Sequence, residues 1–292
     1  MMPLLAILAH ELRILWASWL VRLWLVAAAL TTFITIAPNW DRMPSAPLIA
    51  SLLFPYLVFP WFVVVFMLGI SPVTGARLES LADGVLSRPV TRHEYLLACW
   101  TARVIVVLGV YLVVTVPAAV IVATAKRAGA ADPVTWYGVI ASLAVVGLVL
   151  MLLVSLAFFA GSLLRKPLLA VVVLVFVWFP INAVLATFSL EQFSPISLNQ
   201  SLPTLLRTPW RASDENKQEA VSAEDLRALS RQANRFLSVL SGGTPQAEPK
   251  SPKFFARNDY QDFSLPRVVL GYGIPTLVAL LLTLILFTRR DL

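Results

Sequence analysis

Long apolar stretches separated by short charged segments make up most of the chain. Six windows contain no Asp, Glu, Lys or Arg and consist mainly of aliphatic residues: 23–40, 43–76, 104–125, 133–164, 167–190 and 268–288. A membrane-crossing helix needs about 20 predominantly apolar residues. The pattern therefore predicts six transmembrane helices, near residues 20–38, 48–70, 100–124, 139–163, 168–189 and 268–288. We expect no charge deep inside a span, and Arg22, at a span's end, can reach the headgroups.

The distribution of positive charges predicts the orientation of the spans. Six spans place both termini on one side, and that side carries ten Lys and Arg residues against three in the two short loops opposite. Because cytoplasmic loops are enriched in Lys and Arg, we expect both termini in the cytoplasm. The alternative is a cleaved signal peptide, but the first apolar stretch continues past Ala27–Ala29 into Leu30–Ile36 without a clear cleavage site.

Residues 1–19 predict an amphipathic helix ahead of the first span. One apolar stripe at helical spacing consists of Leu5, Leu8, Leu12, Leu15 and Trp19. His10, Glu11 and Arg13 lie away from this stripe. We expect the helix to lie in the membrane interface with its apolar stripe in the acyl boundary. The alternative is that it extends the first span into the cytoplasm.

The segment 71–99, between the second and third spans, has the most distinctive pattern. Residues 76–86 predict a short helix with an apolar face (Leu78, Leu81, Ala82, Val85) and a polar face (Arg77, Glu79, Asp83). Pro89 prevents simple continuation of this helix. Thr91-Arg92-His93-Glu94 is a capping box, so a new helix is expected to start at Arg92 and run into the third span. Both a docking surface and an ordinary solvated loop fit this pattern.

The segment 190–267, between the fifth and sixth spans, is predicted to be a long external loop. It is nearly neutral, with ten basic and nine acidic residues. Ser222 and Asp225 resemble a capping box that opens a helix, which Gly242-Gly243 would end. This loop could recognise an extracytoplasmic partner, or its helix could pack on the chain's own spans. The whole of 1–292 is predicted to form one transmembrane domain, with 190–267 as an extracytoplasmic insertion.

Composition narrows the function further. Hydrophobic residues make up 59% of the 292 residues and charged residues only 13%, about half the usual share of a soluble protein. These values exclude a disordered chain, a nucleic-acid-binding module and an ordinary cytosolic enzyme. Neither a phosphate-binding loop nor a dinucleotide fingerprint is present, so ATP and other cofactors are not expected on this chain.

Catalytic and metal-binding patterns are also missing from the sequence. His10-Glu11 and His93-Glu94 lack the second histidine of a metalloprotease motif, and Cys99 is expected to be a packing residue. A carrier driven by protons or sodium needs an acidic residue or histidine within its spans, and none is found there. Any transport through this chain is therefore expected to be driven by another subunit.

Three features together resemble the permease subunits of type-2 ATP-binding-cassette exporters. They are the amphipathic helix before the first span, the segment from Leu86 to Tyr95 (LSRPVTRHEY) and the C-terminal ending FTRRDL. In that family the first helix is called the elbow helix, and the short helix between spans 2 and 3 is called the coupling helix. The sequence departs from the family at Ser80-Leu81, where many relatives have Gly-Thr, and at Cys99, where Lys is frequent. The segment 190–267 is also long for the family.

The resemblance implies an exporter of the bacterial inner membrane, made of a permease homodimer and two copies of a separate ATPase that binds ATP and Mg²⁺. It implies that the ATPase is contacted by the coupling residues Arg77, Leu78, Glu79, Leu81, Asp83, Val85, Arg88, Pro89 and Arg92. The elbow helix, with His10, Glu11 and Arg13, would brace them. The cargo stays open, with an amphiphilic or lipid-like molecule suited to apolar spans. The alternatives are a transporter serving metalloenzyme maturation, a membrane scaffold or sensor acting through 190–267, and an intramembrane enzyme.

Overall fold

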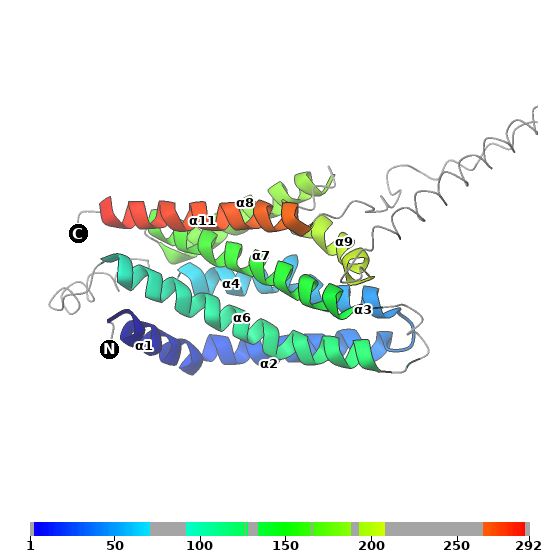
Figure 1. The fold of residues 1–292 in the computed structure, drawn as a ribbon. Helices are drawn as coiled ribbons and strands as arrows, with labels where there is room; N and C mark the ends of the chain where they lie inside the picture. The colour runs from blue at the N-terminus through cyan, green and yellow to red at the C-terminus, as the bar shows by residue number, and fades with distance from the viewer. Residues whose placement is uncertain are drawn as a thin grey trace, which may run out of the picture.

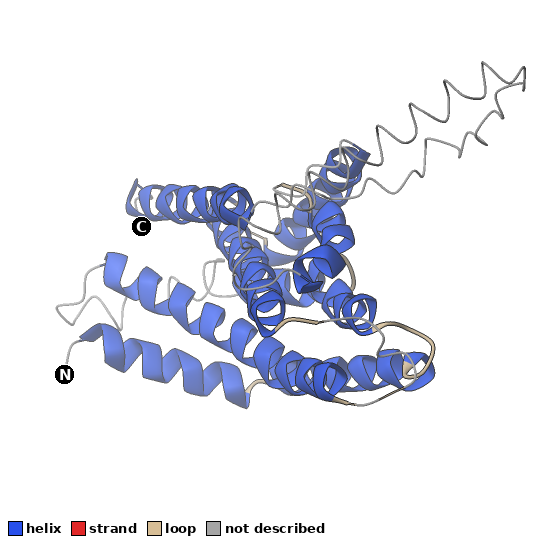
Figure 2. Cartoon of the chain, turned by 45° about the vertical axis from the view of Figure 1, so that its right-hand side comes forward, coloured by secondary structure: helices blue, strands red, loops and turns tan. Residues whose placement is uncertain are grey.

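The described part of the chain is a helical bundle. The computed structural model describes residues 3–70, 92–125, 127, 134–164, 166–187, 193–207 and 265–289. Within these residues the regular elements are all α-helices joined by short loops (Figure 2). They are α1 (Pro3–Ala17), α2 (Trp19–Asn39), α3 (Ser45–Leu57), α4 (Trp61–Ile70), α6 (Arg92–Thr124), α7 (Trp136–Leu163), α8 (Pro167–Thr187), α9 (Pro195–Arg207) and α11 (Leu265–Arg289). The start of α1 and the end of α11 lie at the same end of the bundle (Figure 1).

The predicted spans are found close to their expected positions. Five stretches are long and apolar enough to cross a membrane: Trp19–Asn39, Ser45–Ile70, His93–Thr124, Trp136–Leu163 and Leu265–Leu286. The remaining predicted span corresponds to α8, whose apolar stretch Pro167–Asn182 is shorter. The prediction of an all-α membrane protein is confirmed, and the number of six spans stays a prediction.

The second span is interrupted, which the sequence analysis did not predict. Its two helices, α3 and α4, are separated by Val58, Phe59 and Pro60. Proline has no backbone N–H and its ring crowds the preceding helical turn, so Pro60 favours the end of α3, although Pro55 is accommodated within that helix. The residue before a proline also disfavours helical geometry, which places the break at Phe59. Because Pro60 cannot donate, the Tyr56 carbonyl receives no helical hydrogen bond from residue 60.

The centre of the bundle is α7. This helix packs against α11, α4, α6 and α9, and its buried residues recur on all sides. By contrast, only 17% of the apolar window of α2 is buried, and Leu23, Leu30 and Phe33 are exposed on it. A helix that is apolar on its outer side as well is typical of a membrane-exposed position.

The helix α9 lies within the segment that was predicted to be an external loop. The Ser194 hydroxyl lies near the Ser197 amide at 3.5 Å, at the start of this helix. This helix packs against α3, α7 and α8, and its leucines Leu198, Leu202 and Leu205 are buried. The Thr135 amide, at the start of α7, donates to the Leu206 carbonyl at 3.0 Å, which fixes the end of α9 against α7. Most of the rest of 190–267, including the predicted helix from Ser222, lies outside the described residues.

Candidate functional site at the junction of α1, α4 and α6

The N-terminal helix α1 is separated from the first span by a corner at Ser18. The Ser18 backbone is extended (φ −68°, ψ 137°), and its hydroxyl accepts from the Val21 amide at 3.4 Å, which caps α2. The Arg22 Nε donates to the Trp16 carbonyl at 3.3 Å, which pairs one of the last carbonyls of α1. A separate helix before the first span is therefore confirmed.

Beyond this corner α1 packs along α6. Leu15 is buried, and Leu8 and Leu12 pack against the bundle core. Glu11 lies on this same side, because residues 8, 11, 12 and 15 share one face of a helix. An acidic side chain is thus directed toward the bundle interior.

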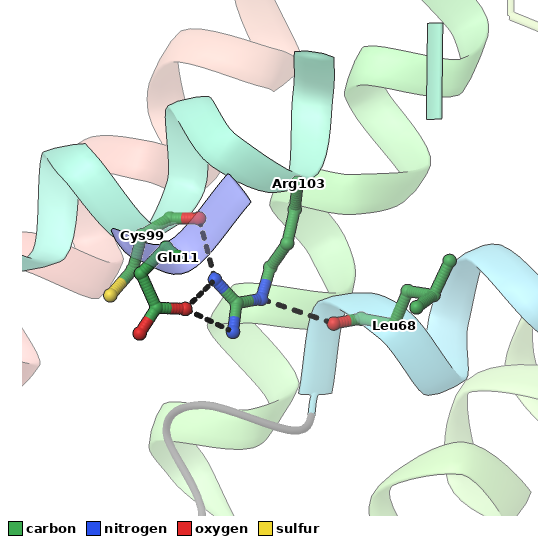
Figure 3. Close-up of polar contacts among 4 residues, drawn as sticks. All are labelled: Glu11, Leu68, Cys99 and Arg103. Atoms are coloured by element: carbon green, nitrogen blue, oxygen red, sulfur yellow. Dashed lines mark hydrogen bonds and ion pairs between the residues drawn. The ribbon is translucent and has the colours of Figure 1, made fainter. Parts of the chain in front are cut away.

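Arg103 of α6 receives this carboxylate. Its Nη1 and Nη2 each lie 3.2 Å from Glu11 Oε2, forming an ion pair (Figure 3). Nη1 also donates to the Cys99 carbonyl at 2.7 Å, and Nε donates to the Leu68 carbonyl at 3.2 Å. All three guanidinium nitrogens of Arg103 are therefore hydrogen-bonded, to residues of α1, α4 and α6.

The pair is shielded from solvent. The Arg103 side chain is 2% exposed and that of Glu11 is 13% exposed. Burying a lone guanidinium would be strongly unfavourable, and the carboxylate together with two carbonyls offsets that cost. If either partner is lost, the other is left as an uncompensated buried charge.

The central helix α7 is tied to the same junction. The Arg103 guanidinium lies over the Phe158 ring, with 5.6 Å from Cζ to the centroid. Trp100, three residues before Arg103, donates through Nε1 to Ser155 Oγ at 3.0 Å. Gly69, next to Leu68, lies so close to Ala157 that there is no room for a Cβ. Helices α4, α6 and α7 are thus in close contact around Arg103.

The junction lies immediately beside the segment predicted to face the ATPase. Leu68 is near the end of α4, and Arg92 begins α6. The intervening residues 71–91 lie outside the described residues, and with them Arg77, Leu78, Glu79, Leu81, Asp83, Val85, Arg88 and Pro89. Arg92 is described as the first residue of α6, so the predicted start of a new helix at Arg92 is confirmed.

The structure places the three predicted elbow residues on two sides of α1, whereas the sequence predicted one polar face. His10 and Arg13 are exposed, as expected for a polar face. The assignment of Glu11 to that face was wrong, because Glu11 points into the bundle and pairs with Arg103. Two residues of the predicted apolar stripe, Leu5 and Trp19, are exposed. The position of α1 in the membrane interface stays a prediction.

Arg103 itself was missed. Arg103 is one of the ten Lys and Arg residues expected on the cytoplasmic side, yet it lies inside the apolar stretch His93–Thr124 and is buried. The burial of Arg103 within the bundle was not expected, whereas the expectation that no span holds a charge deep inside the membrane stays a prediction. Two sequence features could have indicated the pair. Arg103 stands at the edge of a long apolar run, and Glu11 is the single acidic residue of an otherwise apolar helix.

Comparison with known proteins decides the family. The sequence model described as "ABC-2 family transporter protein" matches residues 83–292, which is most of the chain. The chain belongs to the ABC-2 transporter family. No curated protein and no solved structure matches it. An ABC-2 chain is the membrane permease component of an ABC transporter and works with an ATP-binding subunit. The matched range begins within the predicted coupling helix and includes Arg103, whereas Glu11 lies before it.

Proposed function

We propose that this ABC-2 chain exports its substrate with energy from two copies of a separate ATPase, and that the α1–α4–α6 junction transmits the ATPase movement. The buried Arg103 network carries the proposal. A displacement of residues 71–91 reaches the spans through the end of α4 and the start of α6. Arg103 connects both of these to α1 and α7. Packed interiors transmit displacement because they resist compression.

Docking of the ATPase is assigned to the coupling residues around 76–86. ATP and Mg²⁺ would bind on the ATPase, and the permease would contribute a short charged helix and its flanking residues. Glu79 and Asp83 supply negative charge on one helix face, which would attract a basic groove. This assignment, together with the bacterial inner membrane and cytoplasmic termini, is supported by the family and the charge distribution.

Reversing these two charges tests the docking assignment. The double variant Glu79→Lys, Asp83→Lys is expected to insert normally but to lose ATPase co-purification by at least about tenfold, since interfacial like-charge contacts cost several kcal/mol. The matched control is Asp214→Lys, Glu215→Lys, the same charge change within 190–267, which should retain the ATPase. If the Glu79/Asp83 variant co-purifies as much ATPase as the wild type, the coupling residues are assigned wrongly.

A second permease chain completes the proposed transporter. The outer face of α2 is apolar and unburied, with Val26, Leu30 and Phe33 exposed. Such a face suits either lipid or a second copy of the chain. For the homodimer, the protein mass in detergent, corrected for bound detergent, is expected to be twice 32.1 kDa. If the complex with the ATPase contains the mass of only one permease chain, the homodimer is contradicted.

A further inference from the structure

The outer side of the corner between α1 and α2 carries positive charge without a matching acid. Residues 1–40 contain two arginines, Arg13 and Arg22, and a single acidic residue, Glu11. Both arginines are exposed, whereas Glu11 is turned inward and paired with Arg103 (Figure 3). The buried ion pair therefore withdraws the one negative charge of this part of the chain from its surface.

Arg22 lies at the start of a span that faces outward. It belongs to the apolar stretch Trp19–Asn39, of which only 17% is buried. A cation on the lipid-exposed side of a span is costly unless its head reaches the headgroups. The bond from its Nε to the Trp16 carbonyl, at 3.3 Å, directs the guanidinium back toward α1 and so toward the end of the span. This orientation places the charge at the level of the headgroups.

The Arg22 guanidinium still has an unused edge. Its Nη1 and Nη2 make no hydrogen bond to any of the described residues. Two parallel N–H groups of this kind match the oxygens of a phosphate, which they bind as a bidentate pair. The structure thus presents a fixed guanidinium with its phosphate-binding edge exposed.

Arg13 supplies a second cation beside the same tryptophan. It precedes Trp16 by three residues, so the two side chains are neighbours on the surface of α1. Arg13 has no ion pair or hydrogen bond within the described part of the chain. Trp16 is held against α6, because a Cβ at Gly109 would lie 3.5 Å from its ring atom Cζ2. Packing of Trp16 on α6 therefore fixes the place where both arginines meet a ligand.

The apolar surroundings of the two arginines favour a lipid over a soluble acidic partner. Trp19 is 77% exposed next to the corner, and Ile14 and Trp16 are also exposed. Tryptophans are enriched at the membrane–water interface, where one side of the ring meets acyl chains and the other meets headgroups. The same surface continues without interruption into the exposed apolar side of α2.

We propose that Arg13 and Arg22 together bind the phosphate of an anionic phospholipid, whose acyl chains lie along Trp19 and α2. An anionic lipid is favoured over a zwitterionic one because the site offers two cations and no exposed acid for a headgroup ammonium. This binding does not depend on the ATPase or on the proposed function.

Two lipids with the same phosphate test the proposal. Phosphatidylglycerol has a net negative charge, whereas phosphatidylcholine adds a positive choline to that phosphate. The full-length chain, without ATPase, is placed in nanodiscs of the two dioleoyl lipids in equal amounts. Native mass spectrometry then measures the ratio of phosphatidylglycerol to phosphatidylcholine among the lipids that stay bound after release. The wild type is expected to retain mainly phosphatidylglycerol.

Three matched variants locate that preference. Arg13→Gln and Arg22→Gln are each expected to lower the ratio about fivefold, the factor that corresponds to one arginine at an anionic surface. The control is Arg42→Gln, because Arg42 is also exposed but lies beyond the opposite end of α2. It removes the same charge and should keep the ratio of the wild type. Melting temperatures in detergent close to that of the wild type are expected for all three variants, since the three arginines are exposed.

Two results would overturn the proposal. Equal retention of the two lipids by the wild type would show that the corner does not select an anionic headgroup. A loss in Arg42→Gln as large as that in Arg13→Gln and Arg22→Gln would show that the net charge of the chain, and not this site, attracts the anionic lipid.

Discussion

Arg103 carries the largest predicted effect of a single side chain. Arg103→Met removes the cation, leaves Glu11 unpaired in a mostly buried position, and is expected to destabilise the fold by about 3–5 kcal/mol. The measurement is the melting temperature in detergent, in which a thiol-reactive dye reports unfolding. Cys99 suits this measurement because it is the only cysteine and is buried, so it reacts on unfolding.

Arg13→Met is the matched control, because Arg13 lies on the exposed side of the same helix as Glu11. Its melting temperature should stay close to that of the wild type. Exchanging the charges, Glu11→Arg with Arg103→Glu, should not restore stability, since a carboxylate at 103 would face the Leu68 and Cys99 carbonyls. A fully stable exchanged variant would show that the ion pair alone matters and that the carbonyl contacts do not.

The pairing of Glu11 with Arg103 could not be predicted from the sequence. The two residues are 92 positions apart, and α1 also carries exposed apolar side chains, Leu5 and Ile14, on the two flanks of the buried Leu15. The apolar stripe of α1 therefore does not mark where its inner face ends, and Glu11 lies beside the stripe on the inner side. Charge alone then assigns Glu11 to the polar side, and only the packing of α1 on α6 corrects it.

At the scale of the helices, a glycine-to-alanine substitution tests the close contact between α4 and α7. Gly69→Ala would place a Cβ against Ala157, so it is expected to separate the two helices at a cost of about 1–3 kcal/mol. Gly138→Ala should act similarly on α9, because its Cβ would lie 2.6 Å from the Leu206 Cα. Both losses are measured as a lower melting temperature.

Gly273→Ala separates this packing effect from helix propensity. Gly273 is also within a helix, α11, and a Cβ there meets no atom within 4 Å. Alanine favours helix formation by up to about 1 kcal/mol over glycine, so this variant should be neutral or slightly more stable. A loss at Gly273 equal to that at Gly69 would contradict the close-packing account.

Most helices could be predicted from the apolar windows, because length and hydropathy suffice to recognise a span. The break at Pro60 could not, since prolines are frequent in spans and Pro55, Pro117 and Pro275 all lie within helices. The helix α9 was also missed, although Pro195 at its first position and leucines at helical spacing indicated it. A polar composition around it favoured the interpretation as a loop.

For the whole molecule, the family and the general architecture followed from the sequence, whereas the junction that links the helices did not. The segment LSRPVTRHEY carried the resemblance that the family match confirms over residues 83–292. Its coupling residues remain predictions. The structure adds the connection beyond them, in which Arg103 joins the end of α4 to α1, α6 and α7.

The subunit composition of the chain in its native membrane tests this account most directly. The tagged wild-type chain is extracted in mild detergent, and the co-purifying proteins are identified and quantified by mass spectrometry. We expect an ATP-binding subunit in equal number to the permease chain. Recovery of the folded chain without any ATP-binding subunit, from membranes in which one is expressed, would contradict the account.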